Sequence, residues 1–531
     1  MNNKKLQVWL PLLLSIMMIF GMLIGFKIKG NMPGNNIFYN EKQRPVQEVL
    51  NLIKDKYVDD IETDSLADSA IVYILSKLDP HSLFMPAKEL QQVKEELEGQ
   101  FYGIGIEYGM INDTINVLNV IKDGPSEKAG LIMGDKFLKV GDSSAILKGI
   151  KPDKIKQLFR GGNSSKVVVT ILRNNEIKQI TIVRGMIPIY SLDAAYMVSD
   201  SIGYIRLNKF SEVTYKEFMR ATETLQKQGM KSMILDLRDN GGGVLSEATN
   251  IADEFLDGDK LITYTEGKHS PKKEYRCQKE GIFEKGKLAI LSNEGTASAS
   301  EVLIGALQDW DRATIIGRRT FGKGLVQEQF ELSDGSGLRL TIARYYTPLG
   351  RSIQKSYSKG VAAYESELLN RFHDGEVFYA DSTKSDTTKL FKTKSGKIVY
   401  GGGGITPDVF VALDTTAMDK ELSKIYQKGT INNFIYKNYM SHQSNFAAYK
   451  TPLEFQKSFL GDGDTWNSFI EYASKDSVNL SNISQREKTN ILNQIKILTA
   501  RQIWHTEGLY EVSNAADPLI KKALEVLHSE K

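Results

Sequence analysis

The sequence predicts a multidomain α/β protein with helical segments at both ends and a β-rich module ahead of the α/β core. From Ser201 onward, apolar strands, glycine turns and helices alternate, which is typical of α/β folds whose sites lie at the carboxyl ends of strands. Residues 100–185 instead show alternating strands with short helices between them. At 531 residues, the chain is long enough for about three or four domains.

Charge and cysteine content exclude several classes of protein. The 68 basic and 65 acidic residues leave a net charge of +3, which gives no electrostatic case for nucleic acid as a partner. The single cysteine, Cys277, excludes an internal disulfide framework and a cysteine-based zinc site, and six scattered histidines form no ligand cluster. We therefore expect neither a metal nor an organic cofactor.

Residues 1–30 are expected to be a signal anchor. Lys4 and Lys5 precede Leu6–Phe26, a run of 21 residues without a charge, which as a helix is about 30 Å long and can cross a bilayer. No convincing small-x-small cleavage site follows it, although a cleaved signal peptide remains the alternative. The sequence thus predicts a single pass through the inner (cytoplasmic) membrane, with all later residues in the periplasm or otherwise outside the cytoplasm.

Patterns along the rest of the chain predict four further segments. Residues 31–99 are a polar linker and a helical region, 100–185 the β-rich module, 186–412 the α/β core, and 413–531 a mainly helical extension without a readable motif. Helices are expected near residues 46–57, 66–78, 89–98, 126–129, 153–159 and 245–255, and strands at 115–121, 166–174, 176–184, 232–237 and 287–292.

Two side chains in the core are candidates for acyl-transfer chemistry. Ser298 follows the buried strand KLAILS and begins a helix, where backbone N–H groups and the helix dipole favour an oxyanion. Small residues at a helix start are usually caps, so this position alone is weak. Lys323 lies in GRRTFGKGLVQ, 317–327. A lysine whose pKa falls to about 7 through burial can serve as base to a serine, and Phe321, Leu325 and Val326 could form the apolar wall.

The same stretch also resembles a nucleotide-binding P-loop. Gly317 and Gly322-Lys323 match most of that motif, but Gly324 stands where a P-loop carries the hydroxyl that binds Mg²⁺. A P-loop lysine opens a helix, whereas LVQEQFEL alternates as a strand does. The pattern therefore favours a lysine base over a phosphate ligand.

The segment TASASEVLIGALQDWDRATIIGRRTFGKGLVQ resembles the signature of the carboxyl-terminal processing (tail-specific) serine peptidases. That resemblance implies a nucleophile at Ser298, a general base at Lys323, 25 positions later, and a positioning glutamine at Gln327. Asp309 matches an acidic residue that supports the site in some members. Further matches are DLRDNGGG (236–243), YYTPLGRSIQ (345–354), GGGITPD (402–408) and YVDD…LDPHSLF (57–84).

The glycine turn DNGGG is expected to complete an oxyanion hole. The resemblance implies that the backbone N–H of Ala299 and one from the turn bind the oxyanion. We expect Gly242 to be the second donor. The family's usual proline is absent before the last two glycines, so Gly241 and Gly243 stay open.

The β-rich module resembles a PDZ domain. GIGIEY corresponds to the loop and strand that capture a peptide carboxyl terminus, and GPSEKAGLIMGDKFLKVGD to the other hallmark of the module. The resemblance implies peptide binding at Gly103, Ile104, Gly105 and Ile106, through backbone N–H groups and strand addition.

Taken together, the resemblance implies a crotonase/Clp-protease-like α/β core with an inserted PDZ domain. The function expected is a membrane-anchored serine endopeptidase with a Ser-Lys dyad, acting on proteins with exposed C-termini. An adaptor protein and a homo-oligomer are possible further partners. The alternatives are a non-catalytic PDZ scaffold or chaperone on the same fold and a P-loop NTPase. His81 and His269 are expected to be structural or exposed, and Cys277 a bystander.

Overall fold

The computed structural model describes residues 9, 11, 14–22, 45–141, 150–380, 389–414, 420–461, 463–480 and 483–529. It divides into two compact units, Met1–Val72 and Tyr73–Lys531. Ten of the 21 residues of the apolar run Leu6–Phe26 lie outside the described residues. Among those described, no helix has the length and apolar character needed to cross a bilayer. The expected helix near residues 46–57 is α2, Pro45–Lys56, and the next is α3, Thr63–Leu75.

The β-rich module is a five-stranded antiparallel sheet with two short helices. Its strands pair in the order β3-β4-β5-β6-β7. These strands are Ile106–Ile111, Thr114–Val120, Lys136–Val140, Lys166–Arg173 and Glu176–Val183. The helices α5, Pro125–Lys128, and α6, Pro152–Phe159, match the two helices expected there. Strand β2, Gln100–Gly103, pairs with β8, Gly185–Pro188, so the chain enters and leaves the module side by side.

The α/β core is built on a six-stranded sheet in the order β20-β15-β14-β11-β10-β9. Its strands are Leu192–Met197 (β9), Ile202–Leu207 (β10), Ser232–Asp236 (β11), Lys287–Ser292 (β14), Thr314–Gly317 (β15) and Val409–Phe410 (β20). All neighbours pair in parallel except β9 and β10. The carboxyl ends of β11 and β14 therefore lie together, which is where the predicted glycine turn and serine follow.

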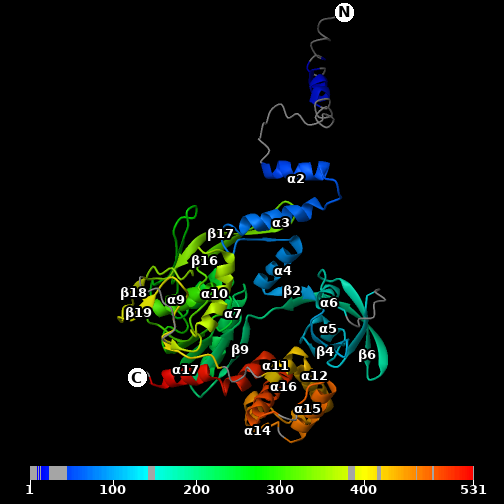
Figure 1. Cartoon of the computed structure of the whole chain (residues 1–531), viewed down its shortest axis with the longest axis vertical. Helices are drawn as coiled ribbons and strands as arrows, with labels where there is room; N and C mark the ends of the chain where they lie inside the picture. Colours follow the sequence, from blue (N-terminus) through cyan, green and yellow to red (C-terminus); the bar gives the residue numbers. More distant parts are fainter. Residues whose placement is uncertain are drawn as a thin grey trace, which may run out of the picture. The chain divides into compact units, whose positions relative to one another are not determined.

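Successive residues of these strands point to opposite faces of the sheet, and helices cover both faces. On one face, Leu235 and Ile290 pack with helices α7 (Thr214–Lys227), α8 (Leu245–Asp253) and α9 (Ala299–Asp309). On the other face, Ile234 and Leu291 pack with the last helix of the chain, α17, Pro518–Ser529. The C-terminal extension thus supplies one layer of the core (Figure 1).

A second, five-stranded sheet carries the lysine loop. Its order is β1-β17-β12-β13, with β16 pairing β17. The strands are Leu83–Met85 (β1), Leu261–Glu266 (β12), Lys273–Arg276 (β13), Leu325–Glu331 (β16) and Gly337–Tyr346 (β17). Lys323 thus leads into strand β16, as the alternation of LVQEQFEL predicts, and not into the helix that a P-loop requires.

The rest of the chain is mainly helical, as expected. Helix α4 is Ala87–Glu98, α10 is Val361–His373, and strands β18, Leu390–Lys392, and β19, Ile398–Tyr400, form a small hairpin. The extension contains α11 (Lys420–Gln427), α12 (Thr430–Ser441), α13 (Gln443–Phe446), α14 (Pro452–Ser458), α15 (Asp464–Lys475) and α16 (Gln485–Asn514) before α17. Helix α16 is broken by non-helical angles at Trp504 and His505.

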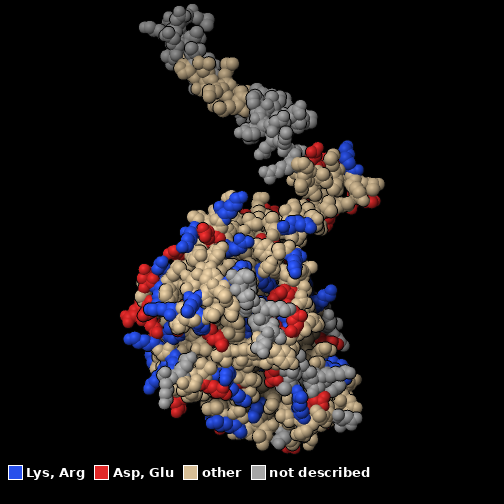
Figure 2. Space-filling model, turned by 60° about the vertical axis from the view of Figure 1, so that its left-hand side comes forward, with Lys and Arg blue, Asp and Glu red and all other residues tan. Residues whose placement is uncertain are grey.

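Basic and acidic side chains are interspersed over the visible face of the molecule (Figure 2). No single-sign field covers that face, which agrees with the near-neutral net charge of +3. The predicted class, an α/β core with a β-rich module and helical ends, is confirmed.

Candidate active site

Residues predicted to act together line one cavity of about 560 Å³. Ser298, Lys323 and Gln327 are in its wall, together with Ala299 and the glycine turn 241–243. The lining also includes apolar side chains, among them Phe210, Leu245, Leu325, Val326 and Tyr345, and charged ones such as Arg339. The cavity therefore offers a reactive serine, an amine and backbone N–H groups within one partly apolar space.

Ser298 lies at a strained turn between a strand and a helix. Strand β14 ends at Ser292, and Ser298 directly precedes helix α9 with φ 57° and ψ −117°. Positive φ is costly for a residue with a side chain, and such strain persists only where the surroundings enforce it. Here α9 is buried along its whole length. The turn thus presents the serine hydroxyl at the start of a fixed helix, as nucleophile turns in other hydrolases do.

The glycine turn packs directly against this serine. A Cβ on Gly242 would lie 2.7 Å from the carbonyl oxygen of Ala297 and 2.8 Å from the Ser298 Cβ, and its φ is +93°. Glycine is therefore required there. The Gly242 N–H donates to Asn240 Oδ1 at 2.9 Å, so it does not point at an oxyanion in this arrangement. The role of Gly242 as second donor stays a prediction, with Gly241 and Gly243 as the alternatives.

The buried carboxylate of Glu301 joins the serine turn to the lysine loop. Glu301 Oε2 accepts the backbone N–H groups of Ser298 at 2.9 Å and Lys323 at 2.8 Å. Oε1 accepts the Gly322 N–H at 2.8 Å and the Thr320 hydroxyl. Burial raises the pKa of Glu301, while these hydrogen bonds act in the opposite direction. A single side chain thereby fixes the backbone of both candidate catalytic residues.

A guanidinium holds the carbonyl side of the same loop. Arg371 of α10 donates to the carbonyl oxygens of Arg319 at 3.1 Å, Thr320 at 2.8 Å and Phe321 at 3.1 Å. The Tyr345 hydroxyl donates to the carbonyl oxygen of Lys323. The lysine loop is therefore held on its N–H side by Glu301 and on its carbonyl side by Arg371 and Tyr345.

The surroundings of Lys323 favour its neutral form. Its pKa lies below the ordinary value of 10.5, first because of burial and then because of the positive charge of Arg339. The carboxylates of Glu301 and Asp79 oppose this shift. Of the predicted apolar wall, Leu325 and Val326 line the cavity, whereas the Phe321 ring lies 3.9 Å from the ammonium of Lys355. A neutral amine next to a serine can accept its proton.

The LDPHS loop reaches this site, which the sequence analysis did not foresee. The Gln327 side-chain N–H donates to the carbonyl oxygen of His81 at 2.6 Å, and His81 Nε2 bonds to the Tyr364 hydroxyl at 2.7 Å. Burial and then the charge of Lys323 lower the pKa of His81 to about 4. His81 is thus neutral and half-buried close to Lys323, and the orienting role of Gln327 toward Lys323 stays a prediction.

Asp309 occupies the opposite end of α9 from Ser298. It forms an ion pair of 2.5 Å with Arg351, with both side chains fully buried, and accepts the Leu349 N–H at 3.0 Å. Eleven residues of helix span about 16 Å, so Asp309 cannot touch Ser298. Any support it gives must pass through the helix.

Comparison with known proteins places these features in a family. The model of peptidase family S41 matches residues 201–363, the PDZ domain model 103–183, and a family of unknown function (DUF8443) 422–505. The "Probable CtpA-like serine protease" of Staphylococcus epidermidis is 34% identical over 366 residues, covering 66% of this chain and 73% of that protein. The chain belongs to peptidase family S41. It is a serine peptidase with a PDZ domain.

Two further similar proteins are a curated relative and a solved structure. The "Carboxy-terminal-processing protease" of Bartonella bacilliformis is 36% identical over 313 residues, covering 58% of this chain and 71% of that protein. Among solved structures, a photosystem II D1 C-terminal processing protease is 27% identical, with 69% of this chain and 86% of that chain covered and a TM-score of 0.35.

In this S41 peptidase, the predicted peptide-binding loop of the PDZ domain lines a second cavity. A space of about 190 Å³ lies between strand β3 and helix α6, and Ile104, Gly105 and Ile106 are in its wall. The apolar ring of Phe159 and the cationic side chains of Lys156 and Arg160 complete it, with Phe101 and Tyr108. Its chemistry suits an apolar side chain followed by a carboxylate.

Cys277 and His269 are expected to take no part in catalysis. Cys277 is buried, and burial raises the pKa of its thiol to about 12, so it is not a nucleophile at neutral pH. His269 is in an exposed loop. Among the described residues no cluster of three or more histidine, cysteine or acidic side chains could hold a metal.

We predict that Glu301→Gln slows catalysis because an amide NH₂ group cannot accept the N–H bonds that a carboxylate oxygen accepts. The expected fall in kcat is about 10- to 100-fold, since small misplacements of reacting groups cost that much. The matched control is Glu365→Gln, an exposed position on α10. Steady-state kinetics of the two variants give the answer, and a Glu301→Gln enzyme with the wild-type kcat would contradict the assignment.

Proposed function

We propose that this peptidase is a membrane-anchored, extracytoplasmic endopeptidase that uses a Ser298–Lys323 dyad and binds the C-terminal tails of its substrates at the PDZ domain. The observation that carries the proposal is the cavity that both Ser298 and Lys323 line, with both backbones held by Glu301. No metal or organic cofactor takes part in the proposed reaction.

The reaction follows from these groups. Neutral Lys323 takes the hydroxyl proton of Ser298 as Oγ attacks the scissile carbonyl carbon, and the carbonyl oxygen becomes an oxyanion. The Ala299 N–H and a glycine N–H of the turn would bind that oxyanion. The Lys323 ammonium then protonates the leaving amine, which leaves an acyl ester on Ser298. Water, deprotonated by Lys323, hydrolyses the ester and restores the serine.

The substrate class rests on the PDZ cavity. A free C-terminal carboxylate is proposed to lie against the N–H groups of residues 103–106 and the charges of Lys156 and Arg160, with its apolar side chain against Phe159. The names of the relatives, carboxy-terminal-processing protease among them, support this choice.

The location rests on the sequence. The uncharged run Leu6–Phe26 would anchor the protein in the inner membrane, with the peptidase core in the periplasm or otherwise outside the cytoplasm. Protease treatment of intact and of permeabilised cells tests this, because an extracytoplasmic core is cut without permeabilisation of the inner membrane.

The dyad is tested by mass spectrometry of an unfolded protein with an apolar C-terminus, incubated in EDTA with the full-length enzyme in detergent. We predict that the wild type cleaves it, whereas Ser298→Ala and Lys323→Ala each lose at least about 10³-fold in kcat. The control is Lys268→Ala, a lysine in an exposed loop. Cleavage that survives Lys323→Ala would mean a different base. A wild type without activity would favour a PDZ scaffold on a peptidase fold.

Tail recognition is tested with the same substrate bearing a C-terminal carboxamide in place of the carboxylate. We expect kcat/KM to fall about 10- to 150-fold, because charge-assisted hydrogen bonds contribute about 1.5–3 kcal/mol. A further substrate keeps the free carboxylate but has aspartate in place of the apolar last residue. Comparing its kcat/KM with that of the original substrate measures recognition of the last side chain separately from recognition of the carboxylate. Equal kcat/KM for carboxylate and carboxamide would show that the PDZ domain does not read the chain end.

A further inference from the structure

Hydrogen bonds from the serine turn, residues 297–300, hold the glycine turn 240–243 in place. The carbonyl oxygen of Asn240 accepts the Ala297 N–H at 3.0 Å and the Ser300 hydroxyl at 2.9 Å. The Asn240 side chain also donates to the carbonyl oxygen of Leu207 at 2.9 Å. The position of the turn relative to Ser298 therefore depends on where residue 240 lies.

Ahead of residue 240 the backbone is strained. Asp239 has φ 61°, a conformation that a residue with a side chain keeps only under constraint. A reciprocal pair of bonds with Asn293 supplies part of that constraint: the Asp239 N–H donates to Asn293 Oδ1 at 2.8 Å, and Asn293 Nδ2 donates to Asp239 Oδ1 at 2.7 Å.

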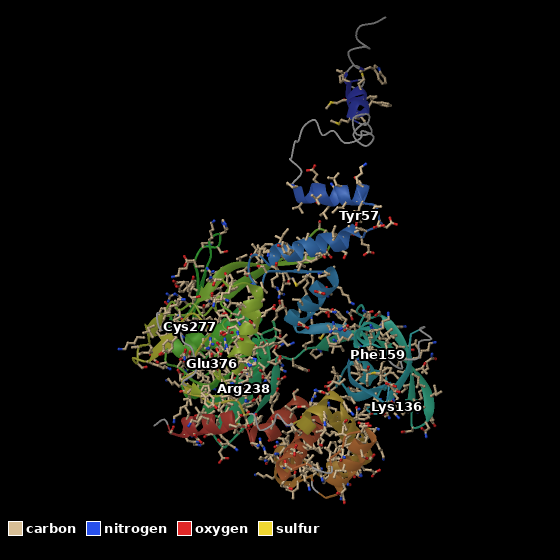
Figure 3. All side chains as sticks on the ribbon, viewed as in Figure 1. Tyr57, Lys136, Phe159, Arg238, Cys277 and Glu376 are labelled. Carbon is tan, nitrogen blue, oxygen red and sulfur yellow. The ribbon has the colours of Figure 1, made fainter. Side chains whose placement is uncertain are left out.

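Arg238, the residue before Asp239, is bound by a side chain of the C-terminal extension. Its guanidinium bonds to the fully buried Asp236 at 2.6 Å and to Asp517, just before α17, at 2.6 Å. Figure 3 labels Arg238 on the side of the core where α17 lies. Both side chains of the Arg238–Asp517 pair are largely buried, with 15% and 18% exposed, so the pair is poorly screened by solvent.

A second contact from the extension reaches the same segment. The guanidinium of Arg206 lies 4.6 Å from the centre of the Tyr510 ring, on the last turns of α16. Arg206 in turn donates to the carbonyl oxygen of Arg238 at 3.0 Å. Besides Asp236 of the core, the two polar neighbours Asp517 and Arg206 thus link residue 238 to residues 510–517 of the extension.

We propose that Asp517, through Arg238, is a positioning residue for the oxyanion-binding turn, and that the C-terminal extension is therefore part of the catalytic apparatus. Asp517 lines a separate cavity with Arg206 and Arg238, and not the one that holds Ser298, so it acts on the reaction without touching the substrate. The proposal rests on the proposed peptidase mechanism, because a positioned oxyanion site has a use only in acyl transfer.

The kinetic test compares Asp517→Asn with wild type in the full-length enzyme. We expect kcat to fall about 10- to 100-fold while KM changes less than about 2-fold, because the oxyanion exists only after the substrate has bound. Asp517→Glu keeps the negative charge. Its fall in log kcat should be at most half of that in Asp517→Asn. Glu525→Gln, an exposed charge on the same helix α17 paired with Lys522, should keep the wild-type kcat.

Three kinetic results would overturn the proposal: an unchanged kcat for Asp517→Asn, an equal loss in Asp517→Glu, or a loss that parallels a lowered Tm. The third would mean that Asp517 only stabilises the fold.

Amide hydrogen exchange tests the same claim without catalysis. In the Ser298→Ala background, we expect Asp517→Asn to speed exchange about 10-fold or more in residues 238–243 and to leave strands β11 and β14 unchanged. Unchanged exchange in 238–243, or faster exchange across the whole sheet, would overturn the proposal. Because this readout needs no activity, it stays decisive even if the wild type cleaves nothing, a result that would count against the peptidase mechanism alone.

Discussion

The buried carboxylate of Glu301 is the contact on which the rest of the site depends. Ser298 belongs to a turn after a strand of the six-stranded sheet, whereas Lys323 precedes a strand of the other sheet. Without a group that binds both backbones, their separation would follow from the packing of two sheets alone. Glu301 lies on helix α9, which is buried throughout, and its oxygens accept N–H groups from residues 298, 322 and 323. One buried helix therefore holds the backbones of both proposed catalytic residues.

The C-terminal extension covers the face of the six-stranded sheet opposite to helices α7, α8 and α9. Its last helix packs against alternate residues of the strands whose carboxyl ends carry the glycine turn and the serine. Removing that layer would expose a buried apolar face, so the extension cannot be a freely dispensable tail. Its helix α16 contacts the PDZ domain, where the Gln502 amide donates to the carbonyl oxygen of Leu118. The same segment thus touches the domain proposed to bind the substrate tail and the loop proposed to bind the oxyanion.

Much of this fold and site can be predicted from the sequence, because the signals are local. The order of strands, turns and helices, the strand after Lys323 and the 25-residue spacing from Ser298 are all visible in the letters. The role of Glu301 could also have been found, since Ser298 and Glu301 have the S-x-x-E spacing of a capping box. The helix length alone likewise separates Asp309 from Ser298.

Other features depend on contacts between distant parts of the chain, which no local pattern encodes. Gln327 meets the carbonyl oxygen of His81 across 246 positions, and Arg238 meets Asp517 across 279. The direction of the Gly242 N–H also cannot be predicted from the sequence. The composition of DNGGG predicts a tight turn, but the direction of each N–H depends on bonds such as that to Asn240.

The central claim is that Lys323 is a neutral base next to Ser298, and a direct titration of its amine tests it best. In the Ser298→Ala protein, the Lys323 Nζ resonance can be followed by nitrogen NMR across pH and assigned with Lys323→Arg. We expect a pKa below the ordinary 10.5. Arg339→Gln should raise that pKa, because a positive charge that opposes protonation is removed. A lysine that titrates at or above its ordinary value, with or without Arg339, would contradict the account.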